Sequence, residues 1–83
     1  MNRLSDFYLE RKRDPWLERR IRWLGHEHVR LGGGGIGEHY LLVAGVSYSD
    51  YCASGDPRLR YAAWRAIAAV SGWQAQVEQR GAQ

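Results

Sequence analysis

A run of four glycines, followed by a fifth, lies near the middle of the chain, where residues 30–40 read RLGGGGIGEHY, and the fold prediction depends on it. The segment before it, HEHVRL at residues 26–31, alternates in polarity, and the segment after it, HYLLVAGVSY at residues 39–48, is rich in Val, Leu and Tyr. Segments of this kind on either side of glycines are typical of two antiparallel strands and their connection. We therefore predict an antiparallel β-hairpin of two to three strands, in which residues 46–51 extend the second strand or form a third.

The predicted hairpin has a definite register. If its turn is centred on Gly33 and Gly34, His28 lies opposite His39, and side chains two residues apart share a face. The residues that would share the face towards the core are Val29, Leu31, Ile36, Tyr40, Leu42, Ala44 and Val46.

The glycines at positions 32, 34 and 37 also match the spacing of the dinucleotide-binding fingerprint GxGxxG. That fingerprint needs a helix directly after the loop, whose amides meet the pyrophosphate, whereas we expect a strand here. Glu38 stands where a phosphate-binding loop has its lysine, and it would repel a phosphate. We therefore favour a flexible connection over a nucleotide site. A third reading is a loop that approaches the backbone of a partner closely, which glycine permits.

Two Asp-Pro pairs, Asp14-Pro15 and Asp56-Pro57, mark helix starts. Asp caps the free amides of a first helical turn, and Pro at the first helical position gives up a donor that has no partner there. The first helix is expected to end at Gly25. Its core-facing residues are Leu17, Ile21 and Leu24, with Trp16 and Trp23 beside them.

The second of these helices is the longer one. Gly72 weakens it by about 1 kcal/mol relative to Ala or permits a bend, and residues 79–83 are expected to fray. A further short helix, capped by Ser5, would lie within residues 5–13. The apolar face of the long helix contains Leu59, Ala63, Ile67, Val70, Gln74 and Val77, with Trp64 and Trp73 near its edges.

Together these elements predict one α+β domain over residues 1–83: an N-terminal helix or two, the hairpin, and the longer C-terminal helix packed on the sheet. Cys52 is the only cysteine, so the chain forms no internal disulfide and contains no CxxC pattern. No apolar run approaches the roughly 20 residues that span a bilayer, and residues 1–14 lack the apolar core of a signal peptide. We therefore expect a cytoplasmic protein with no membrane partner.

Three histidines are the best candidate for a chemical site. In the hairpin register His26, His28 and His39 would converge, as ligands of a zinc ion do. Three histidines on the polar face of an exposed hairpin are the plainer interpretation, and we favour it, so no metal and no cofactor are predicted. Cys52 beside Tyr51 and Ala53 is more typical of a small packed side chain than of a nucleophile. We predict that the protein is not an enzyme.

The charge distribution is more informative. Residues 11–22 contain six basic side chains against two acidic ones, whereas residues 31–57 contain no Lys or Arg. Arg and aromatic side chains together suit a protein interface or single-stranded nucleic acid, and a solvated helix face is the plain alternative. The residues predicted to contact a partner are Arg11, Arg13, Trp16, Arg19, Arg20, Arg22 and Trp23.

These features favour a small protein-binding module whose partner is a bacterial protein or protein complex. In size and character, though through no motif, the chain is similar to phage and mobile-element accessory proteins that inhibit a larger bacterial machine, anti-CRISPR proteins included. The alternative is a small basic nucleic-acid-binding protein that uses the Arg-rich helix. A homodimer is a further prediction, because an edge strand of a small sheet tends to be covered by a partner.

Overall fold

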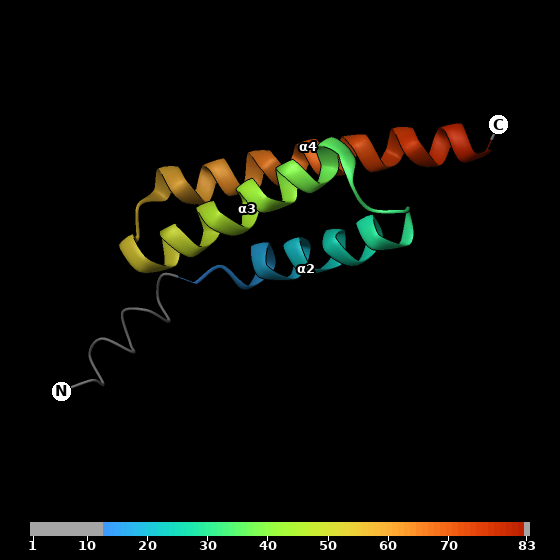
Figure 1. Cartoon of the computed structure of the whole chain (residues 1–83). Helices are drawn as coiled ribbons and strands as arrows, with labels where there is room; N and C mark the ends of the chain where they lie inside the picture. The colour runs from blue at the N-terminus through green and yellow to red at the C-terminus, as the bar shows by residue number, and fades with distance from the viewer. Residues whose placement is uncertain (1–12, 83) are drawn as a thin grey trace.

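The computed structural model describes residues 13–82, and this part of the chain forms three α-helices and no strand (Figure 1). They are α2 (Pro15–Arg30), α3 (Gly35–Ser54) and α4 (Pro57–Ala82). Helices α3 and α4 run antiparallel side by side, and α2 packs along both of them (Figure 1). Arg11 and nearly all of the helix predicted within residues 5–13 lie outside the described residues.

The predicted hairpin, and with it the α+β class, is wrong. Residues 26–30 are the last part of α2, and residues 39–48 are the middle of α3. A strand usually has about five or six residues, whereas α3 continues for 20 residues without a break. Its inward residues follow a helical spacing: Gly37 and Ala44 are buried, seven residues apart. Packing against α4 therefore overrides the strand preference of Val and Tyr.

The glycine run is a turn between helices. Gly32, Gly33, Gly34 and Gly35 all have positive φ values, between 67° and 106°, which glycine adopts without a steric penalty. The amide of Gly33 donates to the carbonyl of His28 at 2.8 Å and ends α2 there. The predicted stop at Gly25 is wrong, because α2 continues through it for five more residues to Arg30.

The face predicted to be the core side of the hairpin is mostly the outside of the molecule. Val29, Ile36, Leu42 and Val46 are all exposed, and only Ala44 of that set is fully buried. The observed core lies where the three helices meet. Its buried apolar residues are Leu17 and Leu24 from α2, Ala44 from α3, and Ala63, Ala66, Ile67 and Val70 from α4. The two predicted helix starts and the core face of α4 are thus confirmed.

A buried carboxylate joins the three helices at one end. Asp14, 7% exposed, caps α2 by accepting from the Leu17 amide at 3.1 Å. Its other oxygen accepts from Arg60 Nε at 2.8 Å and from Trp64 Nε1 at 3.1 Å, both on α4. Its backbone amide donates to the Tyr48 hydroxyl of α3 at 3.0 Å. Burial alone would raise the pKa of Asp14, but the hydrogen bonds from Leu17, Arg60 and Trp64 outweigh it and hold that pKa below its ordinary value.

Candidate functional site

The outer side of α2 brings together most of the residues predicted to contact a partner. Trp16 is 71% exposed and Trp23 is 56% exposed, and their positions lie about 100° around α2 from those of the buried Leu17 and Leu24. Arg19, Arg20 and Arg22 are exposed on the same helix. We call Trp16, Arg19, Arg20, Arg22 and Trp23 the basic-aromatic face.

The two tryptophans of this face are two helical turns apart, so their rings lie about 10 Å from each other along α2. Arg19 lies between them, with its guanidinium carbon 5.4 Å from the centre of the Trp16 ring, a cation–π arrangement. Arg19, Arg22, Trp23 and His26 line a shallow hollow of about 270 Å³. The face is therefore a mixed aromatic and cationic surface with one small depression.

Ion pairs engage two other arginines near α2, one just before the helix and one at its end. Arg13, a predicted contact residue, pairs with Glu18 at 2.8 Å, and this hydrogen bond raises the pKa of Arg13 and lowers the pKa of Glu18. Arg30 pairs with both Glu27 and Glu78. Between residues 13 and 82, no ion pair engages any Arg of the basic-aromatic face, although Arg20 donates to the Ser71 hydroxyl at 3.3 Å.

The three histidines do not converge, because the hairpin that would have joined them does not form. His28 is buried between α2 and the other two helices, with its ring centre 5.1 Å from that of Trp73. His26 is exposed on α2, and His39 is exposed on α3. Among residues 13–82, no three His, Cys, Asp or Glu side chains are grouped to hold a metal ion.

Cys52 and the glycine run are the other two features that the sequence offered as chemical sites. Cys52 is half-buried near Tyr48. Burial raises the pKa of Tyr48, and the neighbouring Cys52 and Glu18 raise it further, against the bond from the Asp14 amide, which lowers it. The glycine run leads into a helix, so our reason for excluding a nucleotide site was wrong. The element before the run is a helix instead of the strand that the fingerprint requires, and Glu38 lies in the first turn of α3. The run therefore has the following helix of a phosphate site but lacks the preceding strand and the lysine.

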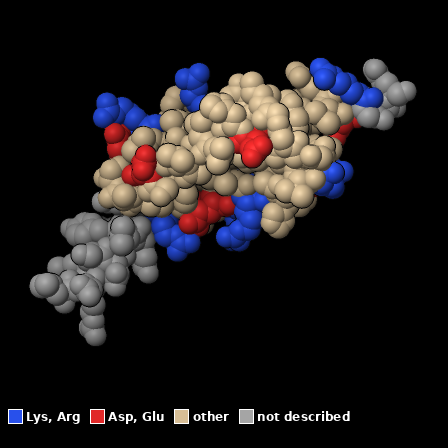
Figure 2. Space-filling model, viewed as in Figure 1, with Lys and Arg blue, Asp and Glu red and all other residues tan. Residues whose placement is uncertain are grey.

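A second exposed surface, which the sequence interpretation missed, lies on the outer side of α3. Ile36, Leu42 and Val46 are 54%, 63% and 61% exposed, and Val43 is 37% exposed. We call these four residues the outer apolar face of α3. In Figure 2, which has the orientation of Figure 1, the middle of the molecule over α3 shows few charged side chains, and most of the basic ones lie at the margins.

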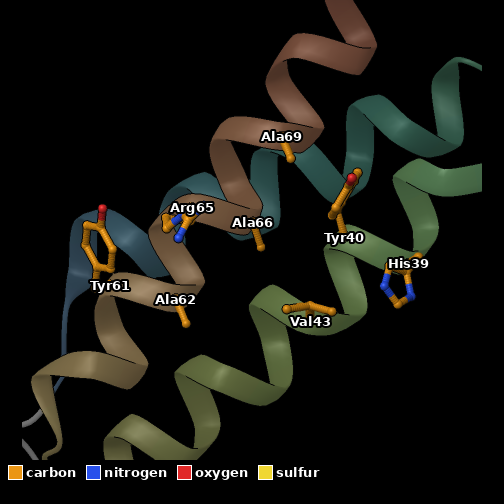
Figure 3. A pocket seen from close by; sticks show the side chains of 8 residues that line it. All are labelled: His39, Tyr40, Val43, Tyr61, Ala62, Arg65, Ala66 and Ala69. Carbon is orange, nitrogen blue, oxygen red and sulfur yellow. The ribbon is translucent and has the colours of Figure 1, made fainter.

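Beside this face, α3 and α4 form an open groove of about 500 Å³. Figure 3 shows Tyr40 and Val43 pointing from α3 towards the α4 side, where three alanines at positions 62, 66 and 69 leave space. His39 points away from α4 (Figure 3). No carboxylate lies among the lining residues of the groove, and its floor is apolar, so the groove is suited to apolar contact.

The spacing of the apolar residues was the signal for this surface. Ile36, Val43 and Val46 are separated by seven and three residues, which places them on one side of a helix. In the predicted strand, Ile36 and Val46 fall on the face expected to be internal, whereas Val43 falls on the other face.

A comparison of the chain with protein-family models, with curated proteins and with solved structures finds no match. Within residues 13–82, no helix combines the length and the apolar character needed to cross a bilayer. The basic-aromatic face and the outer apolar face of α3 are therefore the features from which a function can be inferred.

Proposed function

We propose that this protein is a non-enzymatic binding module of the bacterial cytoplasm that uses the basic-aromatic face to contact a protein partner. The observation that carries the proposal is the exposure of Trp16 and Trp23, two turns apart on one helix, with Arg19 between them. Trp and Arg are among the residues most enriched at the energetic centres of protein interfaces. In the inhibitory form of the proposal, the module covers a working surface of a larger bacterial complex.

The apolar area of the two exposed tryptophans favours a partner that covers the basic-aromatic face. A tryptophan ring can bury roughly 150–250 Å², and both rings lie on the surface of α2 instead of in the core. Leu17 and Leu24 already fill the inner side of α2 with aliphatic groups, so the tryptophans are not needed to close the fold. A partner that covered the rings would remove most of that apolar area from water.

A nucleic-acid partner is the second candidate, because Arg19 stacked on Trp16 resembles the arrangement that holds a single-stranded base. The ion pairs near α2 limit such a contact. Arg13 and Arg30 are already paired with carboxylates, so Arg19, Arg20 and Arg22 are the arginines between residue 13 and the end of α2 that remain for phosphates. Binding to nucleic acid would weaken with salt, with a log–log slope of roughly −0.9 per phosphate contacted on duplex DNA.

The test compares capture of bacterial proteins by four immobilised chains: the original, Trp16→Ala, Trp23→Ala and the control Tyr61→Ala. Tyr61 is a matched aromatic residue, 65% exposed on α4, outside the basic-aromatic face. The lysate is treated with nuclease, and captured proteins are identified by mass spectrometry. We expect a discrete partner that both Trp variants lose and the Tyr61 variant keeps, while all four chains give the same helical circular dichroism.

Two outcomes would contradict the proposal. Equal capture by the Trp variants and the original chain would show that the basic-aromatic face is not the contact surface. Loss of all binding on nuclease treatment, with a steep salt dependence beforehand, would show a nucleic-acid partner instead. For an inhibitor, the activity of the captured complex should fall when the original chain is added and stay unchanged with Trp23→Ala.

A further inference from the structure

The outer side of α3 contains a regular line of six exposed residues whose spacings alternate between three and four. Residues spaced in this way form the seam of a two-stranded coiled coil, because they stay on one side of a helix over many turns. The residues of the line are Ile36, His39, Val43, Val46, Asp50 and Ala53, and we call this line the α3 seam. Leu42, 63% exposed, lies beside it.

The α3 seam is complementary to a reversed copy of itself. When a second α3 is laid antiparallel so that Val43 meets Val46 of the other copy, His39 meets Asp50. At the ends of the same alignment, Ile36 meets Ala53. The two residue numbers of a pair add up to the same total in all three kinds of pair. A single two-fold axis near the centre of α3 therefore relates the two copies in every pair.

We propose that two copies of this chain associate through antiparallel packing of their α3 seams. The apolar centre of the contact comes from Val43 and Val46, and Leu42 adds apolar area at its side. Each end pairs the imidazole of His39, which has an N–H donor, with the Asp50 carboxylate of the other copy, which only accepts, so the polar groups at the two ends are complementary. Asp50 takes part in none of the ion pairs between residues 13 and 82, so its carboxylate is available.

Other occupants fit this seam less well. In a parallel pair, His39 would face His39 and Asp50 would face Asp50, so like groups would meet at both positions. The basic-aromatic face of another copy has cations for Asp50 but none of the apolar spacing. Its packing against α3 would also be head-to-tail, and such a contact leaves an unoccupied surface at each end of the assembly. In the antiparallel pair, by contrast, each copy contributes the same surface, so no contact surface stays unoccupied.

The inference goes beyond the proposed function, because it uses a different surface. The buried residues Gly37 and Ala44 lie on the inner side of α3, where α2 and α4 pack, whereas the α3 seam lies on the outer side. A pair formed through the seam therefore leaves the basic-aromatic faces of both copies exposed. Two exposed faces would let the dimer bind a repeated or symmetric partner with avidity.

The first test measures the mass of the full chain by sedimentation equilibrium from about 1 to about 500 µM, which covers dissociation constants from micromolar to nearly millimolar. The variant is Val46→Asp, which places a carboxylate against Val43 at both symmetric positions. The matched control is Ala68→Asp, on the exposed outer side of α4. We expect a dimer for the original chain and for Ala68→Asp, and a monomer for Val46→Asp. A monomeric original chain at about 500 µM would overturn the proposal.

A charge reversal tests the pairing itself. His39→Asp alone sets two carboxylates against each other at both ends and should weaken the dimer by about tenfold or more. The double variant His39→Asp with Asp50→Lys restores opposite charges and should recover the original dissociation constant within about threefold. Both residues are exposed in the single chain, so the fold is not at risk. Failure of the double variant to recover would overturn the predicted register.

Cysteine cross-linking tests the orientation. In a Cys52→Ala background, oxidation of a mixture of Ile36→Cys and Ala53→Cys chains should join unlike chains. Ile36→Cys alone should not cross-link, since two copies of residue 36 would lie about 25 Å apart along antiparallel helices. Cross-linking of Ile36→Cys with itself would indicate a parallel pair and overturn the proposal. Trp16→Ala should dimerise normally, and Val46→Asp should keep the basic-aromatic face. A failure of the dimer proposal can therefore be distinguished from a failure of the proposed function.

Discussion

Trp64 and Asp14 are joined by a hydrogen bond between the indole nitrogen and a carboxylate oxygen, 3.1 Å apart, although 50 residues separate them in the sequence. The bond fixes the start of α2 against the first turns of α4. Because the same carboxylate also caps α2 and accepts from Arg60, one buried acidic residue holds one end of the bundle together.

Replacing Asp14 by Ala should lower the free energy of unfolding by about 2–3 kcal/mol. Loss of the helix cap costs about 1 kcal/mol, and leaving Arg60 and Trp64 without their acceptor adds the cost of unpaired polar groups. Urea denaturation followed by circular dichroism measures the change. The control is Asp56→Ala, since Asp56 has the same position at the start of α4 but, among the described residues, its carboxylate bonds only to Arg58, two residues away. Equal losses in the two variants would show that the contacts across helices add nothing.

The pKa of Asp14 predicts acid sensitivity. Although burial alone would raise it, the hydrogen bonds from Leu17, Arg60 and Trp64 place the folded pKa below the unfolded one. Asp14 therefore contributes its full stability above the unfolded pKa, about 3.9, and loses it as the pH falls through the lower folded pKa. Asp14→Asn cannot titrate, so its stability difference from the original chain should shrink from about pH 5 to about pH 2. A difference that stayed constant over this range would contradict the assignment.

The sequence predicted the parts of the fold in which the signal is confined to a few residues or in which only one side of a helix is apolar. Asp14 and Asp56, each followed by Pro, mark the starts of α2 and α4 through capping chemistry confined to a few residues. The inner side of α4 shows the helical period because Ala63, Ile67 and Val70 are buried while the opposite side is polar or small.

Helix α3 was not predicted because its apolar residues lie on two sides. Ala44 and Leu41 pack against the core, whereas Leu42 and Val46 are exposed on the outer side. When both sides are apolar the helical period disappears, and the remaining signal, β-branched residues next to glycines, favours a strand. The basic-aromatic face was predictable because its residues are close together in the sequence, whereas the α3 seam required knowing that residues 36–53 are helical.

Gly37 should not tolerate alanine. A methyl group there would lie 2.8 Å from Cε1 of His28 and 2.9 Å from Cε3 of Trp73, so α3 would have to move away from its neighbours. Overpacking of this kind costs about 1–3 kcal/mol, more than the roughly 1 kcal/mol that alanine gains in a helix. We expect Gly37→Ala to lower the midpoint of urea denaturation.

The control for this change is Gly45→Ala in the same helix, where a methyl group meets nothing within 4 Å. Gly45→Ala should leave stability unchanged or raise it by up to about 1 kcal/mol through helix propensity. If both variants were stabilised alike, the close packing of α3 against His28 would be disproved. If both were destabilised alike, the cause would lie in α3 itself and not in that contact.

Replacing the buried His28 by an apolar residue of similar size should not lower the stability of the fold. It is 5% exposed, and neither ring nitrogen has a hydrogen-bond partner among residues 13–82. A buried polar group without a partner costs about 1–3 kcal/mol, so His28→Leu should unfold at equal or higher urea concentration than the original chain. His28→Ala removes the same nitrogens but leaves a cavity beside Trp73, and should destabilise the fold.

His39→Leu on the exposed side of α3 is the control and should leave the stability of the single chain unchanged. A clear loss in His28→Leu would show that the imidazole nitrogens have a stabilising partner, such as a buried water molecule.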